Sequence, residues 1–127
     1  MIEEQYVSLK TAKLAKEKGF NEPCKEYYEF GNDYTTSLPW GTKHEDFRNE
    51  EDILAPTQAM LARWLRERHN MCVEVYSTAY GFIWCICDTD SGTDRYGSKY
   101  SGPNDGGAWD TYEDAKEDGL QEALKKL

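Results

Sequence analysis

The chain lacks the segments that mark membrane and secreted proteins. No apolar run approaches the roughly 18 residues that a membrane span needs. The N-terminal residues Ile2-Glu3-Glu4 form neither the basic nor the apolar region of a signal peptide. We therefore expect a cytoplasmic protein that makes no contact with a membrane. In that reducing compartment the four cysteines, Cys24, Cys72, Cys85 and Cys87, are expected to stay reduced.

Short catalytic motifs are also missing. The chain has no G-x-S-x-G nucleophile elbow, no phosphate-binding loop and no H-E-x-x-H zinc motif. Histidine is scarce. His44 lies in a polar segment typical of an exposed loop, and His69 would end a helix, where the dipole favours a cation. We expect a protein that is not an enzyme and binds no cofactor, although a catalytic site assembled from scattered polar residues stays open.

Acidic and aromatic side chains are abundant. The chain holds 24 aspartates and glutamates against 15 lysines and arginines, a net charge of −9, and it has 9 tyrosines and 4 tryptophans. Acidity disfavours a nucleic-acid backbone as partner and suits a basic protein, although it also serves solubility. With 39% hydrophobic residues over 127 positions, we expect one domain, 1–127, with a modest core.

The N-terminal half gives a clear helix and then weaker signals. Ser8 is a good N-cap for a helix that should end at Gly19. Two β-prone runs, 26–30 and 34–37, flank Gly31-Asn32-Asp33 and predict a short hairpin. The rest of the stretch from 21 to 53 carries no clear pattern.

The C-terminal half predicts a helix, three strands and a second helix. The predicted elements, in order, are helix 56–69, strand 71–77, strand 81–88, strand 95–100 and helix 111–126. The first two strands should join through a turn centred on Ala79-Tyr80, and Asp110 begins a capping-box pattern. We predict an α+β fold: a small antiparallel sheet of three or more strands packed by two main helices, with an additional N-terminal helix.

The alternation of side chains between the two faces of strands 71–77 and 81–88 indicates which residues form the core. Val73 and Val75 share one face of the first strand, which we expect to meet the helices. The predicted core of this half is Leu61, Trp64, Leu65, Val73, Val75, Ile83, Cys85, Leu120, Ala123 and Leu124. The second strand is apolar on both faces, so the face with Trp84 needs a cover or stays exposed as an aromatic patch.

Two candidate partner sites follow from these alternatives. If the aromatic face is exposed, it would be the better partner-binding site, because aromatic anchors dominate interface energetics. Phe82 and Trp84 share this face with Ile86, and we expect Tyr76 of the neighbouring strand across from Trp84. If the stretch from 21 to 53 covers the aromatic face, the acidic face of the last helix would be the better partner-binding site. Those residues are Glu113, Asp114, Glu117 and Asp118.

Two patterns suggest metal ligands, and neither is complete. Cys85 and Cys87 share a strand face, and the predicted turn puts Cys72 opposite Cys87, but no pair has the C-x₂₋₄-C spacing of a zinc knuckle. We expect these thiols to pack as small hydrophobes, with a metal site or a disulfide as alternatives. The alternating run of Asp88, Asp90, Gly92 and Asp94 begins like a calcium loop, but Lys99 stands where a bidentate glutamate is needed. We expect no bound metal.

Nucleic-acid binding is the main alternative to protein binding. Arg63, Arg66 and Arg68 lie beside Trp64 and Tyr76, and charge plus base stacking could bind a single strand. The net charge of −9 weighs against it.

Three segments of the chain carry a family resemblance. They are residues 6–20 (YVSLKTAKLAKEKGF) with 22–24 (EPC); residues 55–60 (APTQAM) with 64–67 (WLRE) and 69–70 (HN); and residues 112–115 (YEDA) with 119–124 (GLQEAL). Together they resemble small uncharacterised proteins of gut Bacteroidales genomes, prophages and phages. The resemblance implies a mobile-element context and an accessory role, and it brings no activity, cofactor or catalytic residue.

We therefore expect a non-enzymatic phage or mobile-element accessory protein that acts by binding another protein, which could be host-encoded. A nucleic-acid-associated accessory protein is the second interpretation, and a small enzyme without a recognisable motif is the third. The sequence leaves the partner and the oligomeric state open.

Overall fold

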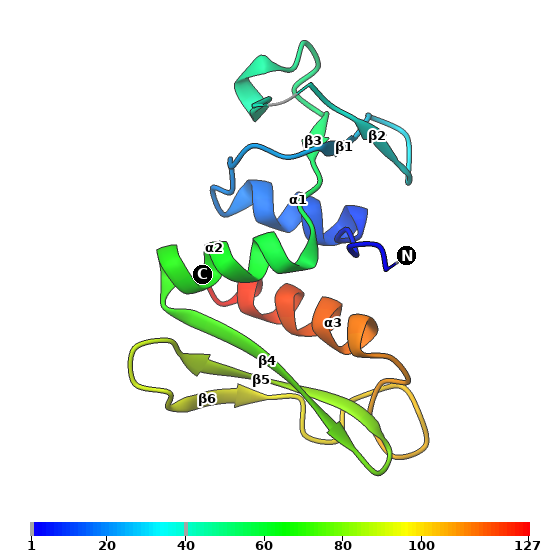
Figure 1. Cartoon of the computed structure of the whole chain (residues 1–127), viewed down its shortest axis with the longest axis vertical. Helices are drawn as coiled ribbons and strands as arrows, with labels where there is room; N and C mark the ends of the chain where they lie inside the picture. Colours follow the sequence, from blue (N-terminus) through cyan, green and yellow to red (C-terminus); the bar gives the residue numbers. More distant parts are fainter. Residues whose placement is uncertain (1, 40) are drawn as a thin grey trace. The chain divides into compact units, whose positions relative to one another are not determined.

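The computed structural model describes residues 2–39 and 41–127 and forms two compact units, residues 1–60 and 61–127 (Figure 1). Helix α2 (Gln58–His69) belongs to both, because the division follows Met60. Helices and antiparallel strands occur together, which confirms the predicted α+β class.

The first unit begins with the predicted N-terminal helix, α1 (Leu9–Glu17). The Ser8 hydroxyl caps it by accepting from the Thr11 N–H at 3.3 Å. Gly19 ends it with a φ of +94°, and the Phe20 N–H then donates to the Ala15 carbonyl at 2.9 Å. Both predicted ends of this helix are confirmed.

A small antiparallel sheet accompanies α1 in this unit. Its strands are β1 (Glu26–Tyr28), β2 (Thr35–Ser37) and β3 (Ile53–Leu54), in the order β2-β1-β3. The predicted hairpin is β1 with β2, whereas β3 was not predicted. A short 3₁₀ helix, η1 (His44–Asp46), lies between β2 and β3 in the sequence. The Tyr28 hydroxyl donates to the Val7 carbonyl at 2.7 Å and ties the sheet to the segment before α1.

The second unit contains the larger sheet. Strands β4 (Met71–Thr78), β5 (Gly81–Asp88) and β6 (Asp94–Gly97) form an antiparallel sheet in that order. Cys72 pairs with Cys87, as the predicted turn requires. Helix α3 (Tyr112–Lys125) runs along one face of this sheet (Figure 1). Its cap differs from the prediction by one residue, because the Thr111 hydroxyl, not Asp110, accepts from the Asp114 N–H at 3.1 Å.

Helix α3 packs closely on the sheet at Gly119. A Cβ built on this glycine would lie 2.9 Å from Cγ1 of Val73 and 3.1 Å from Cγ of Trp84. Lys116 is 8% exposed, and its ammonium donates to the Val73 carbonyl at 2.7 Å. The predicted core residues that are buried are Leu61, Trp64, Leu65, Val73, Leu120, Ala123 and Leu124. Val75, Ile83 and Cys85 are only half-buried.

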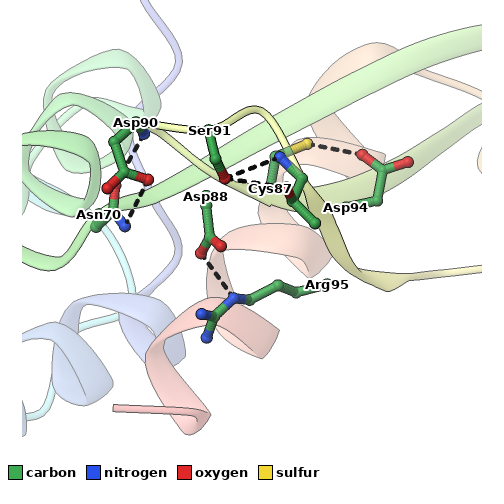
Figure 2. Close-up of polar contacts among 8 residues, drawn as sticks. Asn70, Cys87, Asp88, Asp90, Ser91, Asp94 and Arg95 are labelled. Carbon is green, nitrogen blue, oxygen red and sulfur yellow. Dashed lines mark hydrogen bonds and ion pairs between the residues drawn. The ribbon is translucent and has the colours of Figure 1, made fainter.

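Asn70 fixes the junction between α2 and β4. It adopts a left-handed backbone, with a φ of +55°, that asparagine tolerates better than most residues. Its side chain accepts from the Asp90 N–H at 3.0 Å and donates to the Asp90 carboxylate at 3.2 Å (Figure 2). The end of α2 is therefore tied to the turn between β5 and β6.

Candidate functional site

The sheet of the second unit has one face against α3 and one turned away from it. Directly opposed residues of an antiparallel pair point to the same side of a sheet. The face against α3 carries the pairs Val73–Ile86 and Val75–Trp84. The opposite face, here called the outer face, carries the pairs Cys72–Cys87, Glu74–Cys85 and Tyr76–Ile83.

The predicted faces of β5 are therefore wrong. Trp84 is 5% exposed, and its indole N–H donates to Asp118 of α3 at 2.8 Å. Ile83 and Cys85, expected in the core, lie on the outer face instead. The reason is parity: because Val75 stands opposite Trp84, both must face the same way. Trp84 packs under α3 and does not form a surface patch.

The outer face is acidic and partly aromatic. Tyr76 is 47% exposed, and Glu74 beside it is exposed. Asp94 of β6, which pairs with Cys87, adds a second exposed carboxylate. The charged residues of β4 and β5 are Glu74 and Asp88, so neither strand carries a lysine or arginine. This face presents negative charge around an exposed phenol ring.

Two thiols and a carboxylate meet on this face. The sulfurs of Cys85 and Cys87 are 3.5 Å apart. Oδ1 of Asp94 lies 3.1 Å from the Cys87 sulfur and 3.9 Å from the Cys85 sulfur. The Tyr76 hydroxyl lies 3.4 Å from the Cys85 sulfur. Figure 2 shows the Cys87 sulfur directed at the Asp94 carboxylate. We call Cys85, Cys87 and Asp94 the thiol–carboxylate cluster.

The Cys87 thiol and the Tyr76 hydroxyl keep their protons at neutral pH. Burial raises the pKa of Cys87 to about 12, and its hydrogen bond to Asp94 acts in the same direction. The hydrogen bond to Cys85 raises the pKa of the Tyr76 hydroxyl. Cys72 stands apart from the cluster, because its sulfur lies 2.8 Å from a Glu74 oxygen, and burial raises its pKa to about 11.

The alternating acidic run does not form a calcium loop. Asp88 pairs with Arg95 at 2.6 Å, Asp90 bonds to Asn70, and Asp94 turns to the cysteines (Figure 2). These carboxylates have different partners and do not converge. The run forms the turn between β5 and β6, as expected.

The tentative partner-binding residues fall in separate places. Tyr76 lies on the outer face. Phe82 is half-buried, with its ring 6.2 Å from that of Tyr112. On α3, Glu113 and Asp114 are exposed, whereas Glu117 and Asp118 are half-buried. Asp118 has a structural role, because it accepts the Trp84 N–H.

A groove of about 470 Å³ lies between α3 and β6. Its charged lining residues are Arg95, Lys99, Asp118, Glu122 and Lys126. Because both signs of charge are mixed, the groove does not select one ligand class. The Lys126 ammonium sits 4.1 Å from the centre of the Tyr96 ring.

The arginines of α2 are exposed, whereas the tryptophan of the same helix is buried. Arg63, Arg66 and Arg68 are exposed, but Trp64 is 8% exposed and its ring packs 4.7 Å from that of His69. Arg63 also pairs with Glu67 at 2.9 Å. The aromatic surface that base stacking needs is therefore not offered by Trp64.

His44 of the first unit is not the exposed loop residue that was expected. Its ring is half-buried, and Nε2 accepts from the Leu54 N–H at 3.1 Å. Burial lowers its pKa from 6.5 to about 4, and the nearby Lys16 charge acts in the same direction. The Nε2 atom, which could otherwise act as a base, instead accepts a hydrogen bond from the backbone of β3.

Comparisons with known proteins bring no relative. No family model, curated protein or solved structure matches this chain. Within residues 2–39 and 41–127, no helix is both long and apolar enough to cross a lipid bilayer.

Proposed function

We propose that the chain is a non-enzymatic accessory protein of a phage or another mobile element, and that it acts by binding a basic protein through the outer face of its second unit. The observation that carries the proposal is the exposed Tyr76 flanked by Glu74 on a sheet face without a lysine or arginine on β4 or β5. The mobile-element context rests on the family resemblance of the sequence.

A half-exposed tyrosine on a rigid strand is a good anchor for a partner. Tyrosine is enriched at binding hot spots, because it offers a large apolar ring with a polar tip. Tyr76 stands on an eight-residue strand paired along its whole length with β5, so its position is fixed before binding. Little conformational entropy would then be lost when a partner docks.

Charge selects the partner class. Glu74 and Asp94 place two carboxylates on the outer face, and the chain as a whole carries −9. Such a field attracts a lysine- and arginine-rich protein surface and raises its association rate at low salt. It repels a nucleic-acid backbone. A basic protein segment is therefore the partner class that the outer face fits best.

The proposal is tested by capture on the immobilised full-length protein. Lysate of a Bacteroidales host is passed over the wild type and over the double variant Glu74→Lys/Tyr76→Ala, and retained proteins are identified by mass spectrometry. A candidate partner is then purified and titrated against both forms. We expect a basic protein whose affinity falls at least tenfold in the variant and also falls with rising salt.

The matched control is Asp33→Lys/Tyr34→Ala in the first unit, which makes the same charge change and removes a tyrosine that is 62% exposed. This control should bind like the wild type. Circular dichroism should show both variants folded. Unchanged affinity in Glu74→Lys/Tyr76→Ala would refute the outer face as the site. Retention that disappears after nuclease treatment would instead support the nucleic-acid interpretation.

A further inference from the structure

We propose that Cys85, Cys87 and Asp94 form a binding site for a thiophilic divalent cation of the zinc class, with a fourth coordination position open to solvent. The proposal concerns the thiol–carboxylate cluster and does not rest on the proposed function. Among residues 2–39 and 41–127, it is the one set of three potential ligand groups that converges, with all ligand atoms within 4.8 Å of one another.

The distances fit a tetrahedral centre. A zinc ion with two thiolates and one carboxylate keeps its ligand atoms about 3.5–3.8 Å apart. In the cluster the sulfur–sulfur distance is 3.5 Å, and the sulfur–oxygen distances are 3.1 and 3.9 Å. Each ligand atom therefore needs to move by only a few tenths of an ångström. Thiolate ligands favour zinc-class ions over calcium or magnesium, which take oxygen ligands.

The fold places the ligands before any ion arrives. Cys85 and Cys87 are two residues apart on β5, so both point to the outer face. The pairing of β5 with β6 shifts between Ile86 and Cys87 and sets Asp94 opposite Cys87. The spacing of the cysteines along the chain predicts no metal, because it contains no knuckle. That spacing cannot reveal Asp94, which the strand pairing brings in.

A disulfide between the same cysteines is the competing outcome. Alternate residues of an extended strand have Cα atoms about 6.6 Å apart, near the long end of what a disulfide tolerates. A metal ion can bind both sulfurs without bringing these Cα atoms closer together. On binding, two sulfur–metal bonds form, the two thiol protons pass to solvent, and Asp94 supplies its carboxylate. The site then carries one net negative charge.

Cobalt(II) is the probe for this site. The reduced full-length protein is titrated with Co²⁺ without oxygen, and visible absorption is followed. We expect one equivalent to produce intense tetrahedral bands with thiolate-to-cobalt charge transfer, which Zn²⁺ then abolishes by displacement. Cys85→Ser and Cys87→Ser should each lose the charge-transfer band or weaken binding at least tenfold. Asp94→Asn should weaken binding while keeping the charge-transfer band.

Cys72→Ser is the matched control, because Cys72 is on the same sheet face but its sulfur contacts Glu74. It should bind cobalt like the wild type. Weak octahedral spectra in the wild type would overturn the proposal, as would loss of binding in Cys72→Ser equal to that in Cys87→Ser. A mass loss of two hydrogens, localised to Cys85 and Cys87 in the purified protein, would assign a disulfide instead.

Discussion

His44 shows how a polar side chain can serve the fold without serving chemistry. Its Nε2 accepts the Leu54 N–H at 3.1 Å, and its own backbone N–H donates to the Asn21 side chain at 2.8 Å. A protonated imidazole cannot accept a hydrogen bond at Nε2. The contact with β3 therefore exists only while the ring is neutral, which agrees with the lowered pKa of about 4.

This contact predicts a loss of stability in acid. The folded-state pKa of His44 lies below its ordinary value of 6.5, so the unfolded chain binds the proton more readily. The stabilisation is complete above pH 6.5 and is lost as pH falls through about 4. We expect about 1–2 kcal/mol, allowing for solvent screening of the half-buried ring. Urea unfolding at several pH values should show a smaller pH dependence between 6.5 and 4 in His44→Gln than in the wild type.

His69→Gln is the control for this experiment, because it removes the other histidine and leaves the contact with Leu54 intact. It should retain the pH dependence of the wild type. Parallel pH profiles for the wild type and His44→Gln would contradict the structural role of His44.

Cys24 should react more slowly than Cys72. It is 3% exposed, and burial raises its pKa to about 12, whereas Cys72 is half-buried with a pKa raised to about 11. The thiolate is the reactive form. We expect alkylation of Cys24 in the native protein to be at least tenfold slower than that of Cys72, as measured by mass spectrometry of labelled peptides. Equal rates would show that Cys24 is accessible. In urea the two rates should converge.

At the scale of elements, Gly119 sets how closely α3 approaches the sheet. Alanine normally stabilises a helix interior over glycine by about 0.5–1 kcal/mol. Here the added methyl would meet Val73 at 2.9 Å and Trp84 at 3.1 Å. We expect Gly119→Ala to lower the free energy of unfolding by about 1–2 kcal/mol, because overpacking outweighs helix propensity. Denaturant titration measures this change.

Gly97→Ala, in strand β6 of the sheet that α3 packs on, is the control for Gly119→Ala. A Cβ at Gly97 would have its nearest neighbour, the Trp84 carbonyl oxygen, at 4.0 Å, so the methyl has room. Its effect on stability should be small, within about 0.5 kcal/mol. An increase in stability for Gly119→Ala would show that α3 can shift away from the sheet at little cost.

Over the whole molecule, local signals predicted the elements well and non-local pairing poorly. Ser8 and Gly19 marked α1, and the turn at Ala79-Tyr80 gave the register of β4 with β5. Strand β3 was not predicted, because a strand of two residues is too short to show an alternating pattern. Its partner, β1, also lies far from it in the sequence. Pairing of this kind depends on loop closure, which the local sequence does not encode.

The candidate site was predicted only in part. Cys72 was correctly placed opposite Cys87. Tyr76 was expected on the same face as Trp84, but the pairing puts it on the outer face, and its role in binding stays a prediction. Once Cys72 is paired with Cys87, Val75 must pair with Trp84, and the two must share a face. Because both faces of β5 are apolar, the sequence pattern alone did not show which of them meets the helix. The approach of Asp94 to the thiols depends on a shift in the β5–β6 pairing, for which the sequence offers no marker.

The separation of the two faces of the larger sheet affects how this protein can evolve. Val73, Trp84 and Ile86 are buried on the face against α3, and substitutions there would be removed by selection for folding. Tyr76 and Glu74 alternate with them on the other face, where most substitutions change stability by less than about 0.5 kcal/mol. The exposed outer-face positions, Tyr76 and Glu74, can therefore mutate one at a time through folded intermediates. A lineage facing a partner that keeps changing could alter its specificity repeatedly on the same scaffold.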